Sequence, residues 1–274
     1  MTLDEQINKD LTELYNGKEL SGAKSLASLI SVSTKGLPQH FVGDRDAKTV
    51  FVMLNPGNGV EDSDKDFDKH TKDFDRTSAE TFIKSYICNK RDFGKNDRDR
   101  YDKFDIKQAA FLKAWKNTGI NLPEDFPQNK ETHLAAKEAV LTQKLQLELL
   151  PYCSATFEPD SKNIAPVIPF VEILLDEIFR KERTIVIFGS RFFETAFAEY
   201  NKAKGSTIID MSAEKASTKL PGRASNVSCR PVTLNWNGKT QKALIACTFP
   251  ERTLADMPDV MQAYGAFCYE QFAK

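Results

Sequence analysis

The stretch that most constrains the fold is TVFVMLNPGNG, residues 49–59. Its five consecutive apolar residues, rich in β-branched and aromatic types, are typical of a strand buried on both faces. The strand must end at Pro56, which has no N–H for the ladder, and Gly57 and Gly59 permit backbone conformations closed to other residues. We therefore expect Asn55 on a tight turn at the carboxyl end of a parallel strand, where open α/β sheets bind ligands. An ordinary turn after a strand is the alternative.

Three further strands are predicted, at residues 145–150, 184–188 and 241–247. Residues 145–150 are also compatible with the end of a preceding helix, but Pro151 ends the element in either case. Asn237-Gly238 is a strong type I′ turn signal and predicts a hairpin between residues 231–234 and 241–247. Helical spacing or composition predicts helices at residues 3–15, 21–30, 77–87, 104–117, 131–144, 169–180, 192–200 and 258–272.

This alternation of strands and helices predicts an α/β fold, a three-layer α/β/α sandwich around a four-stranded parallel sheet. We expect the strands in the order 2-1-3-4, which places residues 49–54 on an inner strand. No segment between the strands has the composition of a flexible linker, so residues 1–274 are predicted to form a single domain. The helices within residues 1–40 should pack on that domain.

Composition argues against several functional classes, among them membrane-spanning, secreted and metal-binding proteins. A net charge of -1 and a pI near 6.4 give no overall attraction to nucleic acid or to an anionic membrane. The five cysteines are scattered without a CxxC pair, so we expect no metal site, no cofactor, and the reduced thiols of a cytoplasmic protein. The N-terminus is too polar for a signal peptide, and no apolar run approaches the ~20 residues that span a bilayer.

Charge is nevertheless unevenly distributed along the chain. Residues 61–75 are densely charged and mostly acidic, which indicates either a solvated loop or a lid whose Phe67 or Phe74 covers a ligand. From residue 215 to residue 250 there is no Asp or Glu, whereas six basic residues occur. We expect any contact with DNA phosphates to come from this stretch, through Lys219, Arg223 and Arg230. The alternative is a basic loop that balances the acidic stretch.

The other strand ends supply further candidate ligand-binding residues. Parallel strands bring their carboxyl ends to the same edge of a sheet, so these residues should join Leu54, Pro56 and the Asn55 turn there. The helix after Gly189 also presents free N–H groups to a polar ligand. The remaining candidates at the strand ends are Glu148, Ser154, Gly189, Ser190, Thr248, Phe249 and Pro250.

With these residues in order, the chain resembles the uracil-DNA glycosylase superfamily, in its mismatch-specific and thymine-DNA glycosylase branch. FVMLNPG is similar to the family's G-[IL]-N-P-G motif, and TIVIFGSRFFETAF is similar to its third strand and following helix. LELLPYCS falls where the second strand carries the base-reading residue. IACTFPERT falls where the His-Pro-Ser motif closes the site. The resemblance spans residues 48–250 approximately, with long insertions.

The resemblance implies hydrolysis of an N-glycosidic bond of a modified or mismatched base in DNA, after the base has been flipped out of the duplex. Asn55 would position the attacking water, and backbone N–H groups near Gly57 and Gly59 would bind base oxygens. Several positions depart from the family. Phe249 stands where the histidine is expected, Glu251 where the serine is, and Glu148 where the asparagine is, and the family's glycine is missing before Leu54. A carboxylate donates no N–H to a base carbonyl, unlike an amide. A catalytically silent module that binds nucleic acid or a nucleotide is therefore the alternative.

Overall fold

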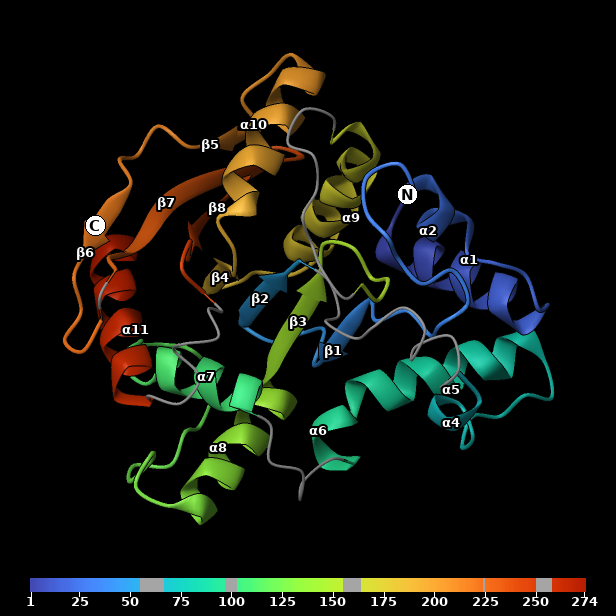
Figure 1. Ribbon diagram of the computed structural model, residues 1–274, viewed down its shortest axis with the longest axis horizontal. Helices are drawn as coiled ribbons and strands as arrows, with labels where there is room; N and C mark the ends of the chain where they lie inside the picture. Colours follow the sequence, from blue (N-terminus) through green and yellow to red (C-terminus); the bar gives the residue numbers. More distant parts are fainter. Residues whose placement is uncertain (55–66, 97–102, 155–163, 224, 250–257) are drawn as a thin grey trace.

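The architecture is an eight-stranded mixed sheet with helices on both faces (Figure 1). The computed structural model describes residues 1–54, 67–96, 103–154, 164–223, 225–249 and 258–274. The strand order is β1-β3-β2-β4-β8-β7-β5, and β6 pairs with β7 beside this path. The strands are β1 (Phe41–Gly43), β2 (Thr49–Met53), β3 (Lys144–Glu148), β4 (Ile185–Phe188), β5 (Ile209–Asp210), β6 (Ala216–Thr218), β7 (Val227–Trp236) and β8 (Lys239–Ile245).

The parallel core of the sheet is β3-β2-β4-β8. In chain order these strands take the arrangement 2-1-3-4, as predicted, and β2 lies between β3 and β4. Five apolar residues in succession suit this inner position, because both faces of β2 are covered. The prediction of a purely parallel four-stranded sheet is wrong, since β1 and β7 pair antiparallel with the two outer strands of this core.

The additional strands escaped prediction because most of them are short. β1, β5 and β6 have only two or three residues each, too few for a period of two to be recognised. The hairpin between β7 and β8 is confirmed. Asn237 and Gly238 adopt φ values of 49° and 74°, the left-handed conformation that a type I′ turn requires at both central positions.

Two groups of helices cover the two faces of the sheet. Val50 and Val52 of β2 face the group formed by α1, α9 and α10, whereas Phe51 and Met53 face α7, α8 and α11. Figure 1 shows these groups on opposite sides of the strands. The helices are α1 (Leu3–Tyr15), α2 (Ser21–Ser25), α4 (Phe67–His70), α5 (Ala79–Arg91), α6 (Phe93–Asn96), α7 (Lys103–Leu112), α8 (Lys130–Gln143), the 3-10 turn η1 (Ala165–Val167), α9 (Ile168–Phe179), α10 (Phe192–Lys204) and α11 (Pro258–Phe272).

Local sequence explains several helix ends. Thr2, Ser78 and Asn129 cap α1, α5 and α8 through side-chain oxygens that accept a backbone N–H of the first turn. α10 ends at Gly205, whose φ of 61° is the left-handed conformation favoured at a helix C-terminus. α2 is shorter than the predicted residues 21–30 and has no side-chain cap.

The N-terminal helix α1 contacts other helices of the structure. α1 packs against α5 and α9. Arg45 links α1 to α9, because its guanidinium binds Asp4 of α1 at 2.6 Å and Glu177 of α9 at 2.5 Å. All five cysteines are free thiols, and Cys153, Cys229 and Cys268 are buried. No helix within the described residues has the length and apolarity needed to cross a bilayer.

Candidate active site at the strand ends

The carboxyl ends of the parallel strands are held together by backbone hydrogen bonds that continue past the strands themselves. Leu150 N–H donates to the Leu54 carbonyl at 2.9 Å, and Gly189 N–H donates to the Val52 carbonyl at 2.8 Å. Ala246 N–H donates to the Phe188 carbonyl at 2.9 Å. Four sequence segments that are far apart in the chain therefore converge on one edge of the sheet, as the strand-end motifs predicted.

Gly189 marks the tightest approach at this edge. A Cβ atom placed on Gly189 would lie 2.6 Å from the Met53 methyl carbon and 3.1 Å from a ring carbon of Phe249. A side chain at position 189 would therefore displace the end of the Met53 side chain and press on the Phe249 ring. The glycine between TIVIF and the following helix thus has a packing function here, in addition to any role toward a ligand.

Glu148, the last residue of β3, has the most unusual environment of the candidates. Its side chain is only 6% exposed. Oε1 accepts a hydrogen bond from Gln146 Nε2 at 2.7 Å and one from Gln39 Nε2 at 3.3 Å. Oε2 is buried and has no hydrogen-bond partner among the residues that the structure describes. One carboxyl oxygen thus accepts two hydrogen bonds, while the other is withdrawn from water and has no partner among the described residues.

The orientation of Glu148 is fixed by a chain of buried polar groups along β3. Lys144 Nζ donates to Gln146 Oε1 at 2.9 Å and forms an ion pair with Asp105 of α7 at 3.3 Å. Gln108 of α7 also donates to Gln146 Oε1, at 3.1 Å, and its own amide oxygen accepts from Lys144. Because these donors occupy the Gln146 oxygen, its NH₂ group must point along the strand toward Glu148.

Burial is the main electrostatic influence on Glu148 and raises the pKa of its carboxyl to about 7. The hydrogen bonds from Gln146 and Gln39 and the charges of Lys144 and Lys90 oppose this rise. Lys90 of α5 is also buried, and burial lowers the pKa of its ammonium group to about 8. Both groups are therefore close to their titration points at neutral pH, a property common in catalytic acids and bases.

The candidates after β8 and β4 make structural contacts. Phe249 is 2% exposed and packs between Phe51 and Phe111, with ring centroids 6.0 and 5.5 Å away. Thr248 Oγ1 accepts from Ser228 N–H at 2.9 Å, which continues the pairing of β8 with β7. Ser190 Oγ accepts from Phe192 N–H at 3.1 Å at the start of α10. Ser154, which follows β3, is buried.

Phe67 and Phe74 pack against the α5 helix. Their rings lie 6.4 and 5.8 Å from the ring of Phe82. Phe74 is 8% exposed, and Arg76 stacks over Phe67 at 5.4 Å. The observed partners of these two aromatics are thus residues of the α4–α5 region. Asn55, Pro56, Gly57, Gly59 and Pro250 lie outside the described residues.

The basic candidates differ in their surroundings. Lys219 is exposed, and Arg223 donates to Ser225 Oγ at 2.9 Å. Arg230 binds Glu194 of α10 at 2.8 Å and also donates to the carbonyls of Met211 and Ala213. The antiparallel register pairs Arg230 with Ile245, so the turn that precedes β7 lies near the carboxyl end of β8. Lys219 and Arg223 therefore lie toward the same edge as Glu148.

The residues that orient Glu148 were missed in the sequence, although a signal existed. KLQLE alternates polar and apolar residues, so Lys144, Gln146 and Glu148 share one face of β3, yet this face is buried. A polar face on a strand inside a helix-covered sheet indicates a buried polar network. Gln39 and Lys90 come from distant segments and carry no comparable signal.

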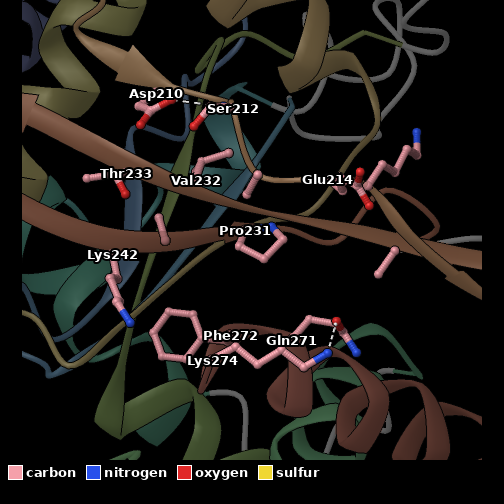
Figure 2. A pocket seen from close by; sticks show the side chains of 14 residues that line it. Asp210, Ser212, Glu214, Pro231, Val232, Thr233, Lys242, Gln271, Phe272 and Lys274 are labelled. Atoms are coloured by element: carbon pink, nitrogen blue, oxygen red, sulfur yellow. Dashed lines mark hydrogen bonds between the residues drawn. The ribbon is translucent and has the colours of Figure 1, made fainter.

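A separate hollow of about 450 Å³ lies against the β7–β8 hairpin (Figure 2). Side chains of both charges line it, among them Asp210, Lys242 and Lys274, together with the ring of Phe272. None of the strand-end candidates that the structure describes contributes to it. Among the described residues, no group of His, Cys, Asp and Glu side chains is arranged to hold a metal ion.

No protein-family model, curated protein or solved structure matches this chain.

Proposed function

We propose that the chain is a divergent relative of the uracil-DNA glycosylase superfamily that hydrolyses the N-glycosidic bond of a modified or mismatched base in DNA. The observation that carries the proposal is the convergence of four segments with family-like motifs at one edge of a 2-1-3-4 parallel core. The alternation of strand and helix alone is common to many α/β folds, so the order of the motifs at that edge is the more specific support.

The chemistry of the site is consistent with this reaction. Departure of a base leaves positive charge on the deoxyribose and negative charge on the base, so the site must supply donors to the base and orient a water molecule. Asn55 follows Leu54 directly and supplies an amide for the water. Glu148 supplies a buried carboxyl beside the same strand end. No cofactor or metal is required for such a hydrolysis.

A catalytically silent module that binds nucleic acid or a nucleotide is the second candidate. The observation that favours it is Phe249, which stands where the family has its histidine and is packed into the aromatic core. An imidazole that stabilises the departing base is therefore replaced by an apolar ring at this position. A silent module would keep affinity for its ligand and release no base.

Asn55→Ala should abolish base release, because the variant loses the amide that orients the water. The measurement incubates the protein with fluorescein-labelled single- and double-stranded oligonucleotides that carry one deoxyuridine, deoxyinosine or deoxyxanthosine. Alkali then cleaves any abasic site, and the products are resolved by electrophoresis. Abasic product with the wild type and none with Asn55→Ala supports the hydrolase. Binding without product supports the silent module.

Lys219→Ser combined with Arg223→Ser should weaken the salt dependence of DNA binding. Removing one phosphate contact reduces the log–log slope by about 0.9, so the double variant should show a slope smaller by roughly two units. Fluorescence anisotropy of a labelled duplex across a salt titration measures the slope. The matched control is Lys239→Ser with Lys242→Ser, at the opposite end of the β7–β8 hairpin, where no change is expected. If the Lys219/Arg223 variant and the control variant show the same slope, Lys219 and Arg223 do not contact the DNA.

A further inference from the structure

Glu148 combines three features that together exceed the needs of a structural residue. Its carboxyl is more than nine-tenths buried, Oε1 is held by two amide donors, and Oε2 has no partner within the described part of the chain. Burying a carboxyl in this state costs free energy, which a purely structural position avoids with an apolar residue or with complete hydrogen bonding. Glu148 is the last residue of β3 and pairs with Met53, the residue before Leu54, at the strand-end edge.

Burial and the neighbouring charges act on Glu148 in opposite directions, because burial favours the acid and the charges of Lys144 and Lys90 favour the carboxylate. Lys144 is already engaged with Asp105 and with two glutamines. Lys90 exerts a favourable charge interaction on Glu148 but forms no ion pair with it at bonding distance. Cys153 interacts electrostatically with Lys90. Among the described residues, the polar and charged groups that interact with Glu148 are Gln146, Gln39, Lys144 and Lys90.

We propose that Glu148 is the general acid of the reaction and that its Oε2 protonates the departing base. The inference rests on the proposed function and extends it, because it assigns to Glu148 the neutralisation of the base that the absent histidine cannot perform. The substrate class is then a nucleobase that leaves after accepting a proton at a ring nitrogen or an exocyclic oxygen.

The step balances without any further reactant. The bond between the anomeric carbon and the base nitrogen breaks, and its electron pair passes to the base. The base takes the proton from Glu148 Oε2. Water adds its oxygen to the anomeric carbon and loses one proton, which returns Glu148 to its acid form directly or through solvent. The products are the free base and the abasic deoxyribose.

The orienting network explains why Oε2 carries the proton. Gln146 and Gln39 both donate a hydrogen bond to Oε1. A proton on Oε1 would point its hydrogen at these N–H donors, which disfavours protonation of that oxygen. The proton is therefore confined to the other oxygen, Oε2. Burial keeps the acid form populated at neutral pH, since it raises the pKa of Glu148 to about 7.

The test measures kcat/KM of base release between pH 5 and pH 9, because this quantity reports the ionisation of the free enzyme. Wild-type activity should fall above a pH of about 7, as Glu148 loses its proton. Glu148→Gln should lower kcat/KM by roughly 10²–10⁴-fold and remove this alkaline decrease, because an amide has no proton to transfer. Gln39→Leu should move the decrease to higher pH, since it removes a hydrogen bond that favours the carboxylate.

Glu177→Gln is the matched control, because Glu177 is an equally buried carboxyl on α9 that binds Arg45. Its profile should keep the wild-type alkaline decrease. An unchanged pH profile in Glu148→Gln, with abasic product still formed, would overturn the role of Glu148 and leave the hydrolase proposal intact. If the wild type releases no base from any of the oligonucleotides, both proposals fail. Circular dichroism of each variant verifies that it is folded.

Discussion

Gly265→Ala should destabilise the protein by about 3 kcal/mol, although alanine is the better helix former by about 1 kcal/mol. Gly265 lies in α11, directly against the backbone of α7. An added Cβ would approach the Phe111 carbonyl oxygen to 1.9 Å, its carbon to 2.7 Å and its Cα to 2.9 Å. These are backbone atoms, so no side-chain rotation relieves the overlap. The two helices must separate, and the aromatic contacts between them weaken with that movement.

Those contacts make the separation costly. The ring of Tyr264 lies 5.5 Å from that of Phe111, and the ring of Trp115 lies 5.4 Å from Tyr269 and 5.2 Å from Phe272. Urea unfolding at neutral pH measures the free-energy change. Gly205→Ala is the control, because Gly205 needs a left-handed backbone but has no atom near its added Cβ. The strain alone should cost that control roughly 1–2 kcal/mol. A Gly265→Ala variant at least as stable as the wild type would contradict the close seating of α11 on α7.

Lys144→Met should destabilise the protein by about 3–5 kcal/mol, which is the usual cost of removing one partner from a buried ion pair. The Lys144 side chain is fully buried, and its ammonium group serves Asp105, Gln108 and Gln146 together. Methionine fills a similar volume, so the loss reports the removed charge and hydrogen bonds rather than a cavity. Chemical denaturation at pH 7 provides the measurement.

A double-mutant cycle with Asp105→Asn separates the ion pair from general damage to the site. If Lys144 mainly compensates the Asp105 charge, the double variant should be less destabilised than the sum of the single variants. Simple additivity would show that Lys144 and Asp105 are not coupled. A Lys144→Met variant within about 0.5 kcal/mol of the wild type would show that the chain of polar groups along β3 contributes little to stability.

The features of the fold that could be predicted are those that follow from local sequence patterns. The five apolar residues of β2, the Asn237-Gly238 turn and the alternation of strands with helices predicted the order of the parallel core and the position of β2 inside it. β1 was missed because Phe41–Gly43 is a strand only through its pairing with β3. A three-residue segment has no period of its own, so such pairing depends on tertiary context.

The meeting of the strand ends was predictable, whereas the surroundings of the individual candidate residues were not. The motif ends at Leu54, Gly189 and Phe249 predicted which segments would meet. The burial of Phe249 depends on Phe51 and Phe111, which arrive from β2 and α7, and no local pattern shows this. The availability of Glu148 Oε2 likewise depends on Gln39 and on the Lys144 network, both of which belong to the assembled structure.

The strands at the two edges of the sheet affect how readily the protein can associate with itself. A long unpaired edge strand offers its backbone groups to the edge of another molecule and promotes aggregation. Here β1, only three residues long, forms one margin, and the other side of the long strand β7 is covered in sections, by β6 opposite residues 227–229 and by β5 opposite residues 233–234. Residues 230–232 lie between these sections, and there the charge of Arg230 and the missing N–H of Pro231 both disfavour a new strand. In the described part of the chain, the outermost strands of the sheet are therefore too short to pair with the strands of another molecule and extend a fibril.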